Sequence, residues 1–402
     1  MNMRDLKHVD RADVWKADHR AAVLVREENG ITFRYRDTYE GPPVATSLPL
    51  TPQPMHTRGG AVLPFFAGLL PEGRRLTAIQ RAVKSSADDE LTQLLAVGSD
   101  TIGDVMVLPA DVEPCDLDSD DDAGEQPLDD CSFEELFASV ISTNPADRVG
   151  LPGVQDKVSG RLLTLPVRYH DASWILKIDP PAYPHLVANE AFFLAAARAC
   201  GLPCANAEVI QDREGKAGLL VERFDRVWRR GVPGKLAQED ACQVLGVYPA
   251  DKYRVSTEDV IRALSERCLA PIVASRELIR QFAFAYVTCN GDAHAKNFSI
   301  VHDGSSWMPT PAYDVPSTHP YGDTTMALRL QGKDREDIGR RDFIALGETC
   351  GVRQKAIEHA LDELVGRVGD WIARIDELPF DARKKDKLSK ACTYRINRLS
   401  GH

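Results

Sequence analysis

The chain has 402 residues, 43% of them hydrophobic and 27% charged, a composition typical of a globular protein with two or three domains. The formal net charge of −11 comes almost entirely from residues 111–130, which hold ten acidic side chains and no lysine or arginine. The remainder holds 50 acidic and 49 basic residues and is therefore nearly neutral. Its charge gives no indication that this chain alone binds nucleic acid.

Membrane and secretory signals are not evident. The longest nearly uncharged apolar run, residues 61–70, is too short to cross a bilayer, and residues 1–15 lack the apolar core of a signal peptide. Nine cysteines are scattered without a Cys-x-x-Cys pair, which favours reduced thiols. We therefore expect a cytoplasmic protein.

Residues 1–110 are expected to form a small β-rich subdomain. Ala21–Val25 and Ile31–Tyr35 flank an Asn-Gly turn, which predicts a β-hairpin. The proline-rich residues 41–54 predict a loop, and two helical patterns then occupy residues 65–97. A loop and a strand complete the unit.

The acidic stretch, residues 111–130, has few apolar side chains and is predicted to be a disordered linker. A solvated spacer is favoured here over a mimic of nucleic acid.

Residues 131–225 combine short strands and helices. After a helix capped by Ser132, a glycine-containing loop precedes an expected strand at Val158–Leu165, and glycine amides beside a strand can cradle phosphates. A further strand carries Lys177, and the next helix carries Glu190 in its expected first turn. This order matches the kinase pair that fixes nucleotide phosphates, although a surface lysine and a helix-start glutamate are also common.

Residues 226–402 are expected to form an all-helical lobe, because most of their apolar residues recur at three-to-four spacing. The stripe of Leu361, Leu364, Val368 and Trp371 is predicted to be core. The basic residues 383–390 are interpreted as a solvated helix face.

Within this lobe, one short turn holds Asp292, His294, Lys296 and Asn297, and a predicted hairpin then leads to Asp314. Protein kinases place a catalytic Asp five residues before a metal-binding Asn, and a second metal-binding Asp follows a short hairpin. Asp292 would therefore orient the acceptor hydroxyl and take its proton, while His294 and Lys296 are candidate phosphate contacts. A turn without function and a metal-hydrolase Asp-x-His pairing are the alternatives.

The run NGDAHAKNFS followed by PAYDV resembles the signature of the HipA toxin kinases. The Leu-Leu-Pro-Glu-Gly run at residues 69–73 and the Gln-Glu-Asp-x-x-Gln run at residues 238–243 extend the resemblance over nearly the whole chain. The resemblance implies an α/β (α+β) fold, two-lobed and protein-kinase-like, that uses ATP and Mg²⁺.

Site residues follow from the same resemblance. It implies Asp292, His294 and Lys296 as catalytic residues, and Asn297 and Asp314 as ligands of magnesium and contacts of the nucleotide. It implies that the remaining nucleotide contacts are Gly153, Val154, Gln155 and Lys157 of a phosphate loop, Lys177 with Glu190, and the backbones of Glu222 and Phe224 at the adenine. Asp240 and Gln243 either line the cleft or cap a helix.

The resemblance also implies a serine/threonine kinase that acts as the toxin of a toxin–antitoxin pair. Its substrate would be a translation protein such as an aminoacyl-tRNA synthetase, and its partner a HipB-like helix-turn-helix antitoxin, through which operator DNA is contacted. A small-molecule or lipid kinase and a non-catalytic subunit of a repressor complex remain alternatives. Gly150 stands where many HipA kinases have a self-phosphorylated serine, so no self-silencing is expected there.

Overall fold

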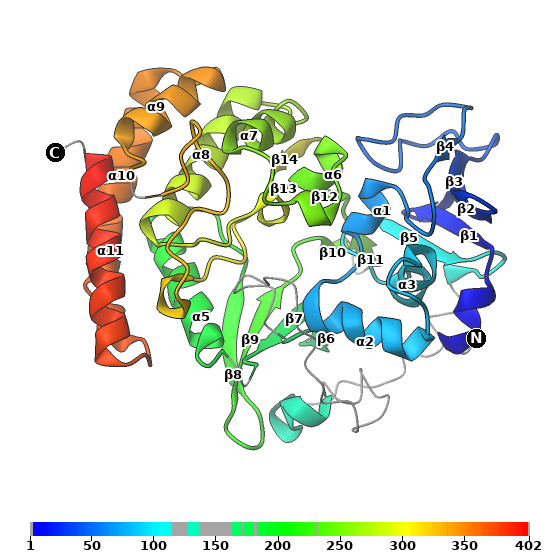
Figure 1. Ribbon diagram of the computed structural model, residues 1–402, viewed down its shortest axis with the longest axis horizontal. Helices are drawn as coiled ribbons and strands as arrows, with labels where there is room; N and C mark the ends of the chain where they lie inside the picture. The colour runs from blue at the N-terminus through cyan, green and yellow to red at the C-terminus, as the bar shows by residue number, and fades with distance from the viewer. Residues whose placement is uncertain are drawn as a thin grey trace.

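The structure is a computed structural model that describes residues 3–114, 128–136, 163–170, 172–180, 183–229, 232–335 and 337–400 (Figure 1). Most of the expected acidic linker lies outside these residues. So do Gly150 and the expected phosphate-loop residues Gly153, Val154, Gln155 and Lys157.

The N-terminal subdomain is built on a five-stranded antiparallel sheet within the described residues. In spatial order its strands are β4 (Met55–His56), β3 (Gly30–Tyr35), β2 (His19–Glu27), β1 (Arg11–Lys16) and β5 (Val105–Pro109). Its helices are α1 (Pro64–Gly68), α2 (Gly73–Val83) and α3 (Glu90–Val97). The predicted hairpin is confirmed as β2 and β3. The helical run is interrupted around Pro71, since proline cannot donate the hydrogen bond that would continue α1.

The middle of the chain forms a second, four-stranded sheet. In spatial order its strands are β6 (Leu163–Tyr169), β7 (Ala172–Ile178), β9 (Ala217–Glu222) and β8 (Ala207–Gln211). Helix α5 (Leu186–Ala199) packs against this sheet (Figure 1). A short helix also begins at Phe133, directly after Ser132 as expected.

Most of the third part is helical. Its helices are α6 (Ala241–Leu245), α7 (Thr257–Ser265), α8 (Pro271–Val287), α9 (Arg340–Thr349), α10 (Gln354–Ile372) and α11 (Ala382–Ser400). The lobe is not all-helical, however. It contains a three-stranded sheet of β12 (Gln238–Asp240), β13 (Ser299–His302) and β14 (Trp307–Pro309), and a hairpin of β10 (Arg226–Arg229) and β11 (Val232–Lys235). With the sheet lobe before it, this gives the expected two-lobed kinase-like arrangement of a mixed α/β chain.

Four details differ from the sequence predictions. Strand β6 continues past Leu165 to Tyr169, because it pairs along its whole length with β7. Glu190 lies in the second turn of α5 rather than the first, because the helix already begins at Leu186, four residues before it. Leu128, inside the expected linker, is buried in the cluster that contains Phe133. Trp371 is only half-buried. The guanidinium of Arg374 lies 4.1 Å from the centroid of its ring, and part of the side chain remains exposed to solvent.

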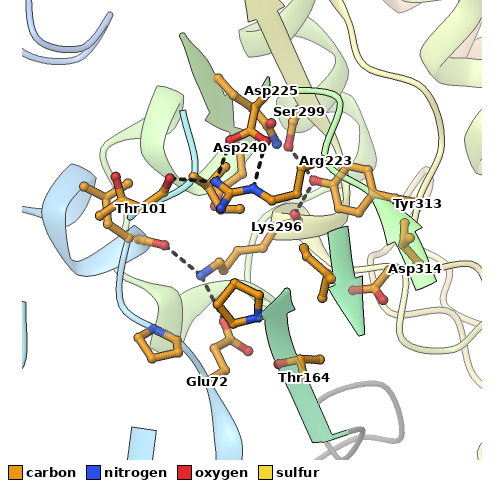
Figure 2. A pocket seen from close by; sticks show the side chains of 18 of the residues that line it. Glu72, Thr101, Thr164, Arg223, Asp225, Asp240, Lys296, Ser299, Tyr313 and Asp314 are labelled. Atoms are coloured by element: carbon orange, nitrogen blue, oxygen red, sulfur yellow. Dashed lines mark hydrogen bonds and ion pairs between the residues drawn. The ribbon is translucent and has the colours of Figure 1, made fainter. Parts of the chain in front are cut away.

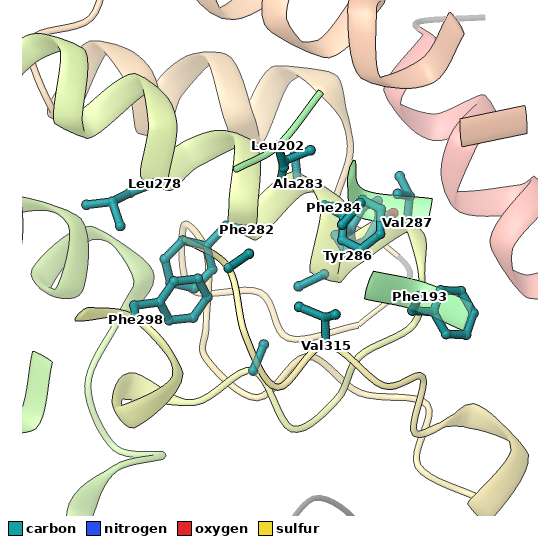
Figure 3. Packing of buried hydrophobic residues seen from close by; sticks show 14 of the residues in the cluster. Phe193, Leu202, Leu278, Phe282, Ala283, Phe284, Tyr286, Val287, Phe298 and Val315 are labelled. Atoms are coloured by element: carbon teal, nitrogen blue, oxygen red, sulfur yellow. The ribbon is translucent and has the colours of Figure 1, made fainter. Parts of the chain in front are cut away.

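A single large hydrophobic cluster fixes the position of the loop after α8 (Figure 3). Phe282 on α8 stacks on Phe298, with ring centroids 3.7 Å apart, and both rings are buried. Phe298 stands between the 3₁₀ turn at Ala295–Asn297 and strand β13. The core therefore fixes the position of the expected catalytic turn through Phe298, the residue that follows it. In the described part of the chain, none of the helices combines the length and apolar character needed to span a bilayer.

Candidate active site

A cavity of about 330 Å³ opens where the N-terminal subdomain, the four-stranded sheet and the helical lobe meet (Figure 2). Each part contributes a wall, from residues 68–72 and 100–102, from β6 and β7 with the segment after β9, and from the turn after α8. The cavity contains nearly all of the described residues predicted to bind the nucleotide or metal. These are Lys177, Glu222, Phe224, His294, Lys296, Asn297 and Asp314.

Lys177 is held between two carboxylates. Its Nζ lies 2.6 Å from Oε1 of Glu190 and also forms an ion pair with Asp314. Strand β7 places the lysine on the face of the sheet that α5 covers, and α5 brings Glu190 beneath it. The pair predicted from sequence order is therefore present in space.

Burial and the neighbouring charges act in opposite directions on the pKa values of this pair. Burial acts to lower the pKa of Lys177, but Asp314 and Glu190 outweigh it and raise that pKa above its ordinary value. Burial raises the pKa of Glu190, with Lys177 acting in the opposite direction and Asp314 adding to the rise. Lys177 is thus a permanent cation at the floor of the cavity, where an anionic phosphate would be attracted.

Asp314 and Asn297 meet after the β13–β14 hairpin, as predicted. Nδ2 of Asn297 donates to Oδ2 of Asp314 at 3.1 Å, and Oδ1 of Asn297 accepts the backbone N–H of His294 at 3.1 Å. Asp314 has a left-handed backbone (φ +54°), an uncommon state for a non-glycine residue that aspartate tolerates better than most. This conformation is maintained by the surrounding contacts and turns the carboxylate towards Lys177.

Asp292 is buried and does not line the cavity directly. Its Oδ1 accepts a hydrogen bond from the hydroxyl of Tyr253, and its backbone N–H donates to Oδ1 of Asn290 at 3.0 Å. Burial, followed by the Asp292 charge, raises the pKa of Tyr253 far above its ordinary value, so this tyrosine remains a donor. The predicted base is therefore held in one orientation by a residue outside the motif.

His294 lines the cavity as a neutral imidazole at physiological pH. Burial, assisted by the Lys252 ammonium, lowers its pKa to about 4, against the influence of Asp292 and Glu72. Its ring packs edge-on against Tyr253, with centroids 5.1 Å apart. It can offer a hydrogen bond to a phosphate but not a positive charge.

Lys296 turns towards the N-terminal subdomain. Its Nζ lies 3.1 Å from Oε1 of Glu72 and donates to the carbonyl of Gly68 at 3.1 Å (Figure 2). Its backbone carbonyl accepts the Tyr313 hydroxyl at 2.8 Å, which fixes the turn. The ammonium expected to contact phosphate is thus paired with a carboxylate from another part of the molecule.

The end of β9 and the residues after it line the cavity where contacts to adenine are expected. The amide of Glu222 donates to the carbonyl of Asn206 at 2.8 Å, so this amide is already engaged within the protein. The ring of Phe224 lies 5.8 Å from that of Tyr313 at the cavity wall. Asp240 and Gln243 do both things considered from sequence, since they form the capping box of α6 and line the cavity.

The donor set suits magnesium. Asn297 and Asp314 carry an amide and a carboxylate, whose oxygens are the hard ligands that Mg²⁺ prefers, and Mg²⁺ commonly keeps its other positions for water and phosphate. In this structure Nδ2 of Asn297 faces Asp314 and its Oδ1 accepts the His294 amide, so the Asn297 side chain would have to turn to offer its oxygen to an ion beside Asp314. No group of three or more His, Cys, Asp or Glu side chains suited to a metal occurs in the described residues. The site therefore fits an ion shared with a nucleotide better than a self-contained metal centre.

Sequence patterns did not indicate a role at this site for Tyr253, Glu72 or Arg75. Tyr253 and Glu72 contact the catalytic turn from distant segments, and Arg75 on α2 lines the cavity, with its pKa lowered by burial. Only Glu72 carried a sequence signal, because it belongs to the Leu-Leu-Pro-Glu-Gly run. Tyr253 and Arg75 stand in ordinary surroundings and become notable only through three-dimensional contacts.

Comparisons with known proteins show which family this chain resembles. A family model described as the HipA-like C-terminal domain matches residues 149–372, and one described as the HipA N-terminal domain matches residues 12–108. A putative kinase of Sinorhizobium fredii is 31% identical over 353 residues, which cover 83% of each chain. The serine/threonine-protein kinase toxin HipA of Shewanella oneidensis is 26% identical over 363 residues, which cover 82% of each chain.

Among solved structures, the fold of this chain resembles that of a protein chain in the Shewanella oneidensis toxin–antitoxin complex of HipA, HipB and operator DNA. The TM-score is 0.76 at 22% identity, and the match covers 97% of each chain. At this identity the likeness establishes the fold.

Proposed function

The chain belongs to the HipA family of toxin kinases, and we propose that it transfers the γ-phosphoryl group of ATP to a serine or threonine hydroxyl of a protein. The observation that carries this proposal is the convergence of Lys177, Glu190, Asn297 and Asp314 on one cavity beside a buried Asp292. Four separate parts of the chain supply these residues, namely β7, α5, the turn after α8 and the segment after β14.

Each residue has a defined task in the proposed reaction. The acceptor oxygen attacks the γ-phosphorus, the bond to the β-phosphate oxygen breaks, and ADP leaves. Asp292 accepts the hydroxyl proton, and Lys177 neutralises phosphate charge while Glu190 holds it in place. Asn297 and Asp314 would hold magnesium, which supplies further charge neutralisation on the phosphates. His294, being neutral, serves as a hydrogen-bond donor at most.

The biological setting is proposed from the relatives. The solved HipA relative was captured with HipB and operator DNA, which supports a HipB-like antitoxin partner here and DNA contact mainly through that partner. A cytoplasmic translation protein, such as an aminoacyl-tRNA synthetase, is the proposed substrate.

Incubation of the purified protein with γ-labelled ATP, Mg²⁺ and a bacterial lysate, followed by phosphosite mapping, tests the proposal. We expect phosphoserine or phosphothreonine on a translation protein, and no transfer when magnesium is chelated. Label in a small molecule or lipid would select the alternative kinase class. Absence of any transfer would favour the non-catalytic subunit.

A further inference from the structure

Glu72 is the place where the N-terminal subdomain contacts the catalytic turn with a charge. It occupies the N-cap position of α2, yet its side chain makes no capping hydrogen bond there. The carboxylate instead forms ion pairs with Lys252 and Lys296, the latter at 3.1 Å. Both lysines belong to the helical lobe.

The cluster is largely removed from solvent. The side chains of Lys296, Lys252 and Glu72 are 14%, 15% and 33% exposed. Burial acts to raise the pKa of Glu72, but the two ammonium groups outweigh it and hold that pKa well below its ordinary value. One ionised carboxylate thus separates two partly buried cations, and removing it would leave them unpaired.

If Glu72 is lost, the mostly buried ammonium of Lys296 loses its ion-pair partner. Lys296 stands one residue before Asn297 in the catalytic turn, and the cavity around it also holds Asp240 and Asp314. Repulsion from Lys252 and attraction to these carboxylates would draw the ammonium away from the N-terminal subdomain and towards Asp314. There it would compete with Lys177 and with the metal for Asp314.

We propose that Glu72 is a positioning residue for phosphoryl transfer: it holds Lys296 against the N-terminal subdomain and so keeps the catalytic carboxylates available. The proposal rests on the proposed kinase function of the same site. It makes activity dependent on a docked N-terminal subdomain.

Simple adhesion between the two parts does not require Glu72. Thr46 donates to Glu239 through its backbone at 2.8 Å and its hydroxyl at 2.6 Å. Gln243 donates to the carbonyl of Phe65 at 3.0 Å, and Tyr248 to that of Val62 at 3.1 Å. These bonds join the same two parts without touching a charged group of the catalytic turn.

The first test compares Glu72→Gln with the control Thr46→Ala, which weakens the same interface away from the cavity. We expect E72Q to lower kcat about 10- to 100-fold, since small misplacements near the reacting atoms are costly, and to raise the KM for ATP, because Lys296 would compete with the metal for Asp314. T46A should keep the wild-type kcat. Equal kcat values for E72Q and wild type would overturn the proposal.

A second substitution separates positioning from adhesion. Lys252→Met removes the cation that repels Lys296, and the Lys252 carbonyl that accepts the Ala295 amide at 3.1 Å is retained. We therefore expect E72Q/K252M to recover several-fold in kcat over E72Q. If Glu72 served only to attach the subdomain, the double variant would be as impaired as E72Q or worse.

A third measurement does not depend on activity. Acylation of lysine amines, followed by mass spectrometry, should label Lys296 and Lys252 faster in E72Q than in wild type, because their ion-pair partner is gone. Unchanged labelling would contradict the ion-paired arrangement. If the wild-type protein transferred no phosphate at all, the proposed function would fail and so would the positioning role, whereas faster labelling would still support the ion pairs.

Discussion

The side chains of the catalytic turn are oriented by contacts with residues that lie far away in the sequence. The five-residue interval between Asp292 and Asn297 predicts their roles, because it arises from a local turn. The Tyr253 hydroxyl on Asp292 cannot be predicted in the same way, since only packing of α7 and α8 brings the two segments together. Nor does the sequence indicate that Lys296 faces a carboxylate rather than a phosphate.

Replacing Tyr253 by phenylalanine removes the donor to Asp292 and leaves the ring in place. We expect kcat to fall about tenfold, because a carboxylate held in one rotamer transfers protons better than a free one, with ATP affinity unchanged. Tyr248→Phe is the matched control, since its hydroxyl donates to the Val62 carbonyl in the subdomain interface and not to Asp292. Steady-state kinetics of both variants decide, and a wild-type kcat for Y253F would remove Tyr253 from this role.

His294 makes stability sensitive to acid. Its pKa is about 4 in the folded protein and 6.5 in the unfolded chain, so the unfolded state binds the proton first as the pH falls. The free energy of unfolding should therefore decrease from about pH 6.5 down to about pH 4. The contribution lost between pH 7.5 and pH 5 is about 2 kcal/mol.

His294→Gln should lack this contribution. Urea unfolding of wild type and H294Q at both pH values measures the difference, and other titrating groups cancel in the comparison. We expect the wild-type midpoint to fall more between pH 7.5 and pH 5. Equal losses in both proteins would contradict the neutral, buried state of this imidazole.

At the scale of elements, patterns with a clear period were predicted well. The hairpin of β13 and β14 was expected because apolar residues flank an Asp-Gly turn, and the helices α9, α10 and α11 because of their three-to-four spacing. Strand β12 was missed, because three residues carry no period and their partner β13 lies about 60 residues later. That pairing makes the catalytic lobe partly β in structure.

The two proposed magnesium ligands stand on either side of the β13–β14 hairpin and can be replaced one at a time. Asn297→Ala and Asp314→Ala each remove a proposed magnesium ligand, so calorimetric ATP affinity measured with Mg²⁺ should fall about tenfold or more. Asp303→Ala is the control, because Asp303 accepts from the amides of Ser305 and Ser306 at the hairpin turn, away from the cavity. Unchanged magnesium dependence in both ligand variants would exclude them from metal binding.

At the scale of the whole molecule, a buried network joins the N-terminal subdomain to the segment between the lobes. Asp225, which is 2% exposed, accepts from Arg223 at 2.9 Å, from Arg226 at 2.7 Å and from the amide of Gly103 at 2.8 Å. Arg223 and Arg226 also reach Asp100. Sequence patterns contain no sign of this interface, because its charged residues are ordinary in composition and depend on the assembled fold.

Asp225→Asn should lower the melting temperature by several degrees, because it leaves two arginines short of a buried partner at a cost of about 3 kcal/mol. Glu377→Gln is the control, since Glu377 pairs with Arg374 at an exposed position. Differential scanning calorimetry compares the two with wild type. A melting temperature of D225N equal to that of E377Q would show that the network does not secure the subdomain.

In the proposed reaction Asp292 assists transfer of phosphate to a hydroxyl. The most direct test of this role is single-turnover transfer from γ-labelled ATP to the mapped protein substrate, with wild type and Asp292→Asn compared under equal ATP saturation. We expect the rate of D292N to be at least about 100-fold below that of wild type, with ATP affinity and melting temperature near those of wild type. Retention of more than a tenth of the wild-type rate would contradict it.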